Sequence, residues 1–430
     1  MQRPTRLSKT PLRWRALSLL TMLAVAGCMA AAPTSPVTVQ STELDKERRF
    51  SDWVEAFKVS ARASGIDEET LRVSFDAVRY IPRVIEQDQR QPEFTRNVWD
   101  YLDSAVSAQR VAAGKIKLLQ WQPTISPIAS RYGVPPEILM AIWGLESSYG
   151  SFTGDISTID ALATLGYDGR RGPWARSQLL AALKILQSRE FDRAQLMGSW
   201  AGAMGQTQFL PSSYLAYAVD ADGDGKRDIW GNTADVMAST ANFMLQAGWQ
   251  AGQVWGVEVR LPPGFDFARA DTRQTTQAWV KQAVQPLNGA PLPEIPDSAI
   301  LLPAGARGPA FLVGPNFRAI LRYNNSTSYA LAVALLAQRL ADGRDVIAPW
   351  PRDLVAMTRL QLVELQTALN AQDFDCGVPD GVLGPATRGC IRLYQMRQGL
   401  PADGYPTVSL LERLQSVAAP KADTLAPSSP

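Results

Sequence analysis

The sequence predicts an α+β fold that is mainly α, with a small antiparallel β insertion and a separate small module at the C-terminal end. Apolar residues recur at helical spacing in several segments between Phe50 and Trp249. Short β-like runs separated by Pro and Gly follow between Trp255 and Asn325. A new helical pattern begins at Leu354, and 430 residues are enough for two or three domains. We therefore expect a main domain over residues 50–345 and a second one over 354–418.

The first residues have the pattern of a bacterial export signal. Five basic residues precede an apolar run from Ala16 to Ala26, which is too short to span a membrane as a helix. The run ends in LAVAGC, which resembles a lipobox, so we expect residues 1–27 to be removed and Cys28 to be lipidated; an ordinary cleavage site is the alternative. Residues 28–49 then form a flexible linker. This places the protein in the bacterial periplasm, held at a membrane by its lipid, with the outer membrane favoured.

The composition excludes several classes of chemistry. There is no His, which removes Ser-His-Asp and Cys-His systems and the HExxH type of zinc site. Lys and Arg (43) nearly balance Asp and Glu (41), so the charge does not favour nucleic acid. Acid–base chemistry must therefore depend mainly on carboxylates. Besides Cys28, only Cys376 and Cys390 remain, and an even pair in an exported chain favours a disulfide.

The stretch VPPEILMAIWGLESSYG predicts a helix that carries the candidate acid, Glu146. Pro135 and Pro136 suit the first turn, and Gly150 suits the position after the end. An apolar stripe is formed by Ile138, Leu139, Ile142 and Leu145. Glu146 lies at the edge of this stripe, where burial would raise its pKa. A helix-edge Glu paired with an Arg is the alternative.

The later helical segments enclose a stretch rich in small residues. SQLLAALKILQSREF and TADVMASTANFMLQAGW both have helical periodicity. Between them, GSWAGAMGQTQFLPSSY would let a ligand approach the backbone closely, and Ser199, Gln206 and Gln208 offer neutral hydrogen bonds. This chemistry suits an amino sugar. Close packing of helices through small residues is the alternative.

The segment DADGDGKRD matches the first half of an EF-hand loop. Its candidate Ca²⁺ ligands are Asp220, Asp222 and Asp224, with the backbone carbonyl of Lys226. The twelfth position is Gly231 and not Glu, so Asp235 at the start of the next helix would close the site, with Asp228 as its competitor. We expect a structural calcium ion; an acidic turn without metal is the alternative.

The region after Trp255 predicts a small antiparallel sheet. Its four β-like runs are VEVRLP, AILLPAG, GPAFLV and FRAILRY. The segment YNNSTSYALAVALLAQRLA then returns to a helical pattern and closes the main domain near Asp342.

Several of these segments together resemble the lytic murein transglycosylases of the membrane-bound B type. The resemblance is carried by VPPEILMAIWGLESSYG, DALATLGYDGRR, GSWAGAMGQTQFLPSSYLAYAVDADGDG and RYNNSTSYALAVALLA. It implies a lysozyme-like catalytic fold that cleaves the MurNAc–GlcNAc bond of peptidoglycan and leaves 1,6-anhydro-MurNAc. It also implies Glu146 as acid/base. The residues implied to contact sugar and peptide are Arg170, Arg171, Ser199, Gln208, Tyr323, Asn324 and Tyr329, with Tyr101 placed only by its distance upstream.

The resemblance implies a mechanism with one carboxyl, in which the 2-acetamido group assists Glu146 and no water is consumed. A hydrolase of the usual kind needs a second carboxylate. Asp155, Asp160 and Asp168 are near in sequence, but none lies in a suggestive motif, and Asp160 fits a helix N-cap. A muramidase that hydrolyses the same bond, and a wall-binding scaffold without activity, are the alternative functions.

The C-terminal segments resemble the peptidoglycan-binding domain of three short helices found on cell-wall enzymes. The motif residues are Asp380, Gly381, Gly384, Thr387 and a second Asp-Gly pair at Asp403. Cys376 and Cys390 flank the first loop, which their disulfide would staple. We expect glycan strands and a membrane as partners, no nucleic acid, a monomer, and disorder over residues 419–430.

Overall fold

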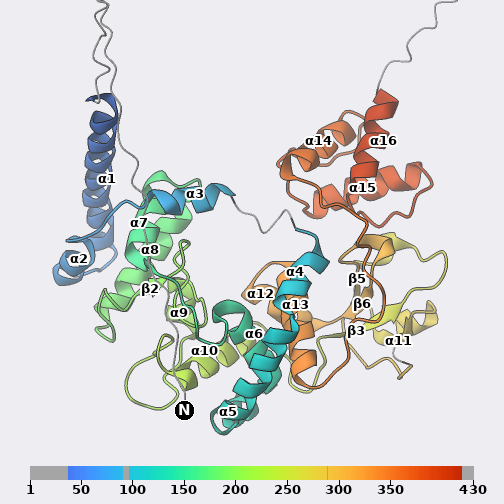
Figure 1. Cartoon of the computed structure of the whole chain (residues 1–430), viewed down its shortest axis with the longest axis horizontal. Helices are drawn as coiled ribbons and strands as arrows, with labels where there is room; N and C mark the ends of the chain where they lie inside the picture. The colour runs from blue at the N-terminus through green and yellow to red at the C-terminus, as the bar shows by residue number, and fades with distance from the viewer. Residues whose placement is uncertain (1–36, 91–95, 288, 419–430) are drawn as a thin grey trace, which may run out of the picture. The chain divides into compact units, whose positions relative to one another are not determined.

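The computed structural model describes residues 37–90, 96–287 and 289–418 (Figure 1). The predicted signal peptide, Cys28 and the predicted tail over 419–430 lie outside these residues. The chain divides into two units at the boundary between Arg49 and Phe50. Within the described ranges, no helix is both long enough and apolar enough to cross a membrane.

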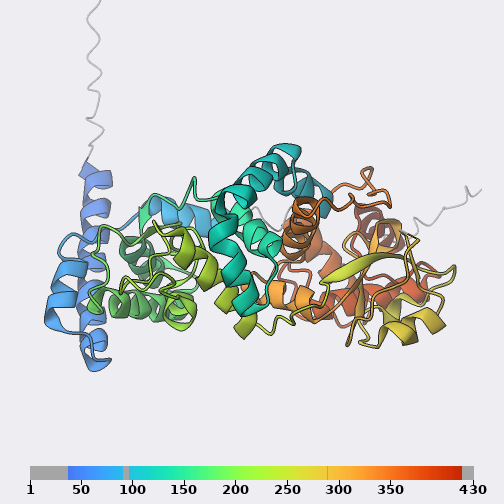
Figure 2. The same ribbon diagram turned by 90° about the horizontal axis from the view of Figure 1, so that it is seen from below.

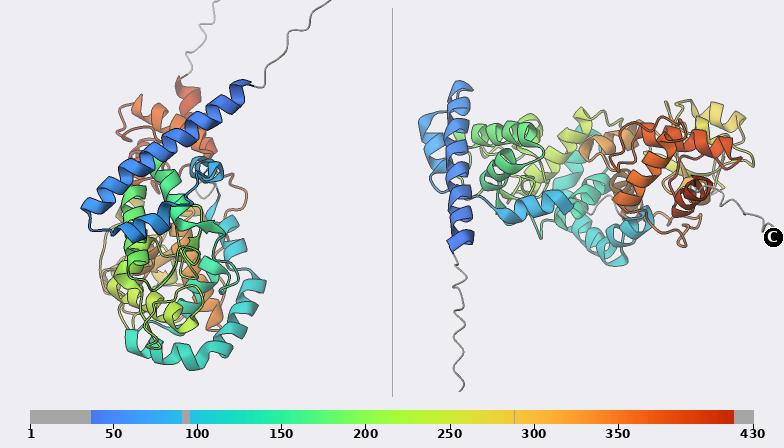
Figure 3. Two further views of the ribbon diagram at one scale, coloured as in Figure 1. Left: turned by 90° about the vertical axis from the view of Figure 1, so that its left-hand side faces the viewer. Right: turned by 90° about the horizontal axis from the view of Figure 1, so that it is seen from above.

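The first described helix, α1 (Val37–Ala63), is continuous in Figure 3. Residues 37–49 are therefore helical where a flexible linker was expected. The reason is a change in composition: the Pro- and Ser-containing stretch ends at Pro36, and good helix formers such as Glu43, Lys46 and Glu47 follow.

The main domain is mostly helical, as predicted. Its other helices are α2 (Glu68–Phe75), α3 (Pro82–Arg90), α4 (Val98–Ala105), α5 (Ala108–Tyr132), α6 (Pro136–Ser147), α7 (Thr158–Asp168), α8 (Gly172–Gln187), α9 (Pro211–Tyr217), α10 (Thr233–Gln246), α12 (Pro315–Tyr323) and α13 (Thr327–Leu340). The helical sequence pattern over residues 69–88 is divided into α2 and α3, and the pattern over residues 95–120 is divided into α4 and α5. Pro82 separates α2 from α3, and Ser107 caps the start of α5 by accepting a hydrogen bond from the Arg110 backbone N–H.

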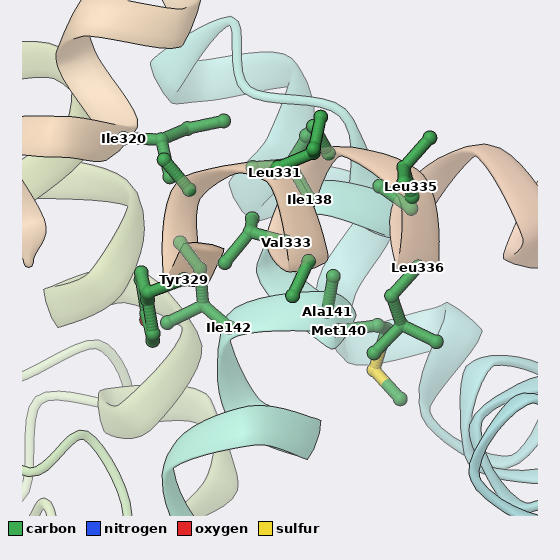
Figure 4. Close-up of a cluster of buried hydrophobic side chains, with 14 of the residues drawn as sticks. Ile138, Met140, Ala141, Ile142, Ile320, Tyr329, Leu331, Val333, Leu335 and Leu336 are labelled. Carbon is green, nitrogen blue, oxygen red and sulfur yellow. The ribbon is translucent and has the colours of Figure 1, made fainter. Parts of the chain in front are cut away.

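The candidate acid lies on a largely buried helix of the main core. Helix α6 packs against α13, and both are apolar on nearly every side (Figure 4). Ile138 and Ile142 of α6 lie among Leu331, Val333 and Leu336 of α13 in this cluster. A helix enclosed in this way holds its side chains in fixed positions, which suits a site that needs defined geometry.

The β insertion is a four-stranded antiparallel sheet in the order β4-β3-β6-β5. Its strands are β3 (Gly256–Arg260), β4 (Gln285–Pro286), β5 (Ala299–Leu301) and β6 (Ala310–Val313). Val257 pairs with Leu312, and Ile300 pairs with Leu312 from the other side. The short helix α11 (Thr276–Lys281), which was not predicted, lies beside the strands in Figure 2, and its Trp279 is fully buried against them.

The prediction of a strand for FRAILRY is wrong, because these residues form α12. Pro315 occupies the first turn of this helix, and Phe317 and Ile320 are three residues apart and both buried. A short apolar run does not by itself distinguish a strand from a buried helix. Overall, the mainly α fold with a small antiparallel β insertion is confirmed.

The C-terminal module has three helices, α14 (Arg359–Asn370), α15 (Pro385–Arg397) and α16 (Val408–Ala418). Cys376 and Cys390 form a disulfide with their Cα atoms 5.1 Å apart. Each Asp-Gly pair is held by a Gln: the Gly381 N–H donates to Gln366 Oε1, and the Gly404 N–H donates in the same way to Gln395.

The second Asp-Gly turn also contacts the β insertion. Asp403 Oδ2 accepts a 2.7 Å hydrogen bond from the Ala306 N–H, while its Oδ1 accepts one from the Tyr405 N–H within the turn. Nearby, Arg392 pairs with Asp271 at 2.6 Å. The module is thus docked on the main domain through polar contacts.

Candidate active site

Glu146 lies in the last turn of α6 and accepts a 2.6 Å hydrogen bond from the hydroxyl of Tyr329. Tyr329 belongs to the first turn of α13 and is buried, whereas Glu146 keeps partial exposure. The packing of α6 on α13 therefore brings together two residues that are 183 positions apart in the sequence.

Burial raises the pKa of Glu146 from 4.5 to about 7, and the Tyr329 hydrogen bond opposes this rise. Burial and the nearby Glu146 carboxyl both raise the pKa of the Tyr329 hydroxyl well above its usual value. Tyr329 therefore stays protonated and donates the hydrogen bond. A carboxyl with this pKa is present in both protonation states near neutrality. It can therefore donate a proton in one step and accept one in the next.

The backbone after Glu146 is strained, which the sequence did not indicate. Ser148 and Tyr149, neither of which is Gly, have φ of 50° and 60°, and Gly150 follows with φ of 81°. Helix α6 ends at Ser147 with Ser148 as its C-cap, so Gly150 does not directly follow the end of the helix as predicted. Tyr149 turns back into the core, where its hydroxyl donates to the Arg110 carbonyl at 2.9 Å. The ring fits only because a Gly faces it on α6: a Cβ at Gly144 would lie 2.6 Å from the ring. This buried ring holds the turn in place.

The predicted tyrosines form a stacked pair next to Glu146. The rings of Tyr323 and Tyr329 are 6.5 Å apart and nearly parallel, at 6°. The Tyr323 hydroxyl donates to the Thr207 carbonyl at 2.6 Å. Asn324 is exposed at the end of α12. Tyr101, on α4, is half-buried against the same core, and it contributes to the raised pKa of Tyr329.

The segment rich in small residues forms a tight loop beside α6. It begins at β2 (Met197–Gly198), which pairs with β1 (Ile156–Ser157), and Ser199 Oγ accepts from the Ala203 N–H at 3.2 Å. Gly154 is required here, because a Cβ would lie 2.0 Å from the Gly198 carbonyl oxygen. Backbone therefore approaches backbone closely, which small residues permit.

The two glutamines of this loop have different roles. Gln206 is buried, accepts from Trp143 Nε1 at 2.7 Å and donates to the Trp230 carbonyl at 2.6 Å, so it ties the loop to α6. Gln208 donates through Nε2 to the carbonyls of Thr153 and Gly205. Only the amide oxygen of Gln208 then remains to accept a hydrogen bond from a ligand.

Arg170 and Arg171 contact helix α3 and two tryptophans instead of Glu146. Both guanidiniums approach Asp88 Oδ1, at 3.4 and 2.8 Å respectively. Arg171 also lies over the rings of Trp174 and Trp200, at 4.6 and 5.8 Å from their centroids. Asp88 was not singled out from the sequence, because nothing in its own segment marks it.

The carboxylates considered as a second catalytic group have other partners. Asp160 is buried and pairs with Arg193 at 2.6 Å, and Ser157, not Asp160, caps α7, so the N-cap prediction is wrong. Asp168 accepts from the Tyr80 hydroxyl at 2.5 Å, and Asp155 lies 3.8 Å from Arg83.

The acidic loop gathers three of the predicted metal ligands. Carboxylate oxygens of Asp220, Asp222 and Asp235 lie within 4.8 Å of one another. Asp235 is fully buried, and burial together with Asp222 and Asp220 raises its pKa to about 6, against the opposing backbone hydrogen bonds. Asp224 is outside this group; its Oδ1 accepts from the Lys226 N–H at 2.8 Å. Three carboxylates, one of which is the buried Asp235, fit Ca²⁺, which prefers oxygen ligands.

The competitor Asp228 forms a turn instead. Its Oδ1 accepts from the backbone N–H groups of Trp230 and Gly231, both at 2.9 Å. Of the two candidates for the late ligand, Asp235 therefore has the better position.

Comparisons with known proteins agree with this geometry. Residues 49–338 match the family model of the transglycosylase SLT domain, and residues 358–414 match that of the peptidoglycan binding domain. Membrane-bound lytic murein transglycosylase B of Escherichia coli K12 is 33% identical over 262 residues, 59% of this chain and 71% of that protein.

Solved structures show the same relationship. SltB3 from Pseudomonas aeruginosa, in complex with NAG-anhNAM-pentapeptide, is 50% identical with a TM-score of 0.82, over 85% of this chain and 99% of that one. The Escherichia coli lytic transglycosylase SLT35, in complex with calcium, is 30% identical with a TM-score of 0.58, over 69% and 93%. The first family model covers more than half of the chain. The chain therefore belongs to the transglycosylase SLT domain family and is a peptidoglycan lytic transglycosylase of the membrane-bound B type.

Proposed function

We propose that the chain cleaves the β-1,4 bond between MurNAc and GlcNAc without water, with Glu146 as its single acid/base. The observation that carries this proposal is the half-buried Glu146, whose pKa of about 7 lets it exchange a proton in both directions. It is supported by the partners of Asp155, Asp160 and Asp168, each of which is engaged away from Glu146.

In the first step, protonated Glu146 donates its proton to the glycosidic oxygen, and the C1–O bond breaks as the neighbouring 2-acetamido oxygen attacks C1. In the second step, the Glu146 carboxylate removes the proton of the C6 hydroxyl. The C6 oxygen then bonds to C1 and displaces the acetamido oxygen, which closes the 1,6-anhydro ring. Glu146 ends protonated, and no water is consumed.

We also propose roles for the residues around Glu146. Tyr329 orients the carboxyl through its hydrogen bond, and the stacked Tyr323 supports Tyr329. The residues that contact sugar or peptide are Arg170, Arg171, Ser199, Gln208, Asn324 and Tyr101. Aromatic faces suit sugar rings, and guanidiniums suit the carboxylates of a stem peptide.

Mass spectrometry of the fragments released from purified sacculi tests the reaction. We expect anhydro-muropeptides from the wild type and none from Glu146→Gln, which is nearly isosteric but cannot exchange the proton. Fragments heavier by one water would show a muramidase instead. Wild-type binding to sacculi with no release of fragments would show a scaffold.

A structural calcium ion is a further part of the proposal. Asp220, Asp222 and Asp235 would hold it. Asp224, which is outside this group of carboxylates, and the backbone carbonyl of Lys226 are further candidate ligands. The donor set supports this assignment, as does the calcium named for the relative SLT35. The ion would link the acidic loop to the start of α10, which carries Asp235.

The remaining proposals concern placement in the cell. We propose a monomer in the periplasm, anchored by a lipid on Cys28 after removal of residues 1–27, with the outer membrane favoured. The domain limits are proposed as 50–345 for catalysis and 354–418 for wall binding. A chain that ends before Leu354 should bind sacculi less well than the full chain. Reduction of the Cys376–Cys390 disulfide should weaken binding of the full chain, because such a bridge in a small domain contributes about 2–5 kcal/mol.

A further inference from the structure

Asp88 is a nearly fully buried carboxylate that holds two arginines at once. The residue is 3% exposed, and its Oδ1 lies 2.8 Å from a terminal nitrogen of Arg171 and 3.4 Å from one of Arg170. A buried carboxylate needs such charged partners, since burying it alone is very costly. Helix α3, which carries Asp88, packs on α7, the helix that ends just before the arginine pair.

Asp88 holds one nitrogen of the Arg171 guanidinium, and two tryptophan rings restrict the orientation of its plane. Its centre lies 4.6 Å from the ring centroid of Trp174 and 5.8 Å from that of Trp200. Trp200 directly follows Ser199 in the loop beside α6. Contacts with two aromatic rings and one carboxylate leave a planar group little freedom to turn.

Most donors of Arg171 are not used by the protein. Among the described residues, its one hydrogen-bond acceptor is Asp88, and its side chain is 33% exposed. The buried pair Asp160–Arg193 differs in this respect, because Arg193 also donates to the carbonyls of Ser74 and Ala77. That pair is satisfied by the fold, whereas Arg171 keeps unused donors: its Nε is buried with no hydrogen-bond partner in the part of the chain that the structure describes, and about a third of the side chain is exposed.

We propose that Asp88 is a positioning residue that holds Arg171, and with it Arg170, ready to bind a free carboxylate of the stem peptide. A guanidinium whose orientation is fixed loses less entropy when it forms a bidentate pair with a carboxylate. The preferred substrate class is thus a glycan whose stem peptides keep their carboxylates. The inference rests on the proposed function in one respect, namely that Arg171 contacts the substrate.

Binding measurements on the full chain test this role without catalysis. In a Glu146→Gln background, calorimetry compares two disaccharide-pentapeptides, one with free stem carboxylates and one with those carboxylates converted to carboxamides. We expect Asp88→Asn to weaken binding of the free-acid ligand by about tenfold, as for loss of one well-placed charged hydrogen bond, and of the amidated ligand by less than about twofold. The control is Asp155→Asn, which removes the exposed ion-pair partner of Arg83, a residue on the same helix α3 as Asp88. It should change the affinity for neither ligand.

A double-mutant cycle with Arg171→Ala separates positioning from a general structural effect. If Asp88 acts mainly through Arg171, with Arg170 as its weaker partner, Asp88→Asn should cause a clearly smaller loss of free-acid affinity in the Arg171→Ala variant than in the chain that keeps Arg171. Thermal melts identify variants that fail to fold. If Asp88→Asn fails to fold, Arg170→Ala replaces it, because Arg170 has an exposed side chain. This variant should weaken binding of the free-acid ligand and leave binding of the amidated ligand unchanged. Equal loss of both ligands, or losses that simply add in the cycle, would overturn the proposal. Release of anhydro-muropeptides from sacculi by the Glu146→Gln background would instead contradict the proposed function.

Discussion

Glu146 and Asp235 are both carboxyls whose pKa is raised mainly by burial, yet their surroundings suit opposite functions. Glu146 has a pKa of about 7, and within the described part of the chain its carboxyl has one hydrogen-bond partner, the neutral Tyr329 hydroxyl. Asp235 has a pKa of about 6, and its two oxygens accept from the backbone N–H groups of Ala221 and Asp228 at 2.8 and 2.7 Å. Two more carboxylates lie beside Asp235.

The difference shows that the neighbours of a buried carboxyl, and not burial alone, decide its role. A single neutral donor leaves Glu146 able to take up and release a proton. Fixed N–H groups on both oxygens favour the ionised form of Asp235, while the adjacent carboxylates oppose it. A divalent cation would resolve that conflict by binding an oxygen of each of the three carboxylates.

The largest expected effect is on catalysis at Glu146. Glu146→Gln should lower the rate of muropeptide release by at least about 100-fold, since general acid–base catalysis contributes about 10²–10⁴-fold. Glu137→Gln, the same change in the first turn of α6, is the matched control and should keep most of the activity. Residual turnover of Glu146→Gln above about a hundredth of the wild type would contradict the single-carboxyl mechanism.

The second effect concerns stability and pH. Because the folded-state pKa of Glu146 is raised from 4.5 to about 7, its stabilising contribution is complete below pH 4.5 and is lost as the pH rises through 7. Glu146→Gln carries no such charge, so above pH 7 it should be more stable than the wild type by up to about 3 kcal/mol. Denaturant unfolding at pH 4.5 and pH 8 measures this. A difference that does not grow with pH would show that Glu146 is not desolvated in solution.

The third effect concerns calcium. Calcium at about 100 times its Kd should stabilise the chain by about 2.7 kcal/mol relative to a chelator, measured in thermal melts. The increment should shrink as the pH falls through about 6, because Asp235 then becomes protonated and cannot bind the ion. Asp220→Asn should abolish the increment, and Asp224→Ala should reduce it less, since Asp224 lies outside the three-carboxylate group. The same melting temperature with calcium and with a chelator would contradict the proposal of a structural calcium ion.

The smallest effect concerns the Tyr329 hydroxyl, the hydrogen-bond donor that Glu146 has and Asp235 lacks. Tyr329→Phe removes a hydrogen bond that lowers the pKa of Glu146, so the alkaline limb of the pH–activity profile should move up by less than about one pH unit. Tyr323→Phe is the control, because the Tyr323 hydroxyl bonds to the Thr207 carbonyl and not to Glu146. A downward shift in Tyr329→Phe, or the same shift in both variants, would contradict the assigned role of Tyr329.

The sequence by itself determined the features that depend on local pattern. The periodicity around Glu146, with Pro136 in the first turn, defined helix α6 and placed the carboxyl at its apolar edge. The alternating Asp residues from Asp220 identified the acidic loop, and the absence of His narrowed the chemistry to carboxylates. Turn residues and helical spacing act over a few positions, so they can be read directly from the chain.

Only the tertiary structure decided which distant residues meet. Tyr329 reaches Glu146, and Asp88 reaches Arg171, through helix packing that no local pattern encodes. The run FRAILRY forms α12 because its apolar residues Phe317 and Ile320 lie on one face of the helix and pack into the main core. The raised pKa of Glu146 has the same origin, since desolvation depends on every element packed around a group and not on the residues next to it in sequence.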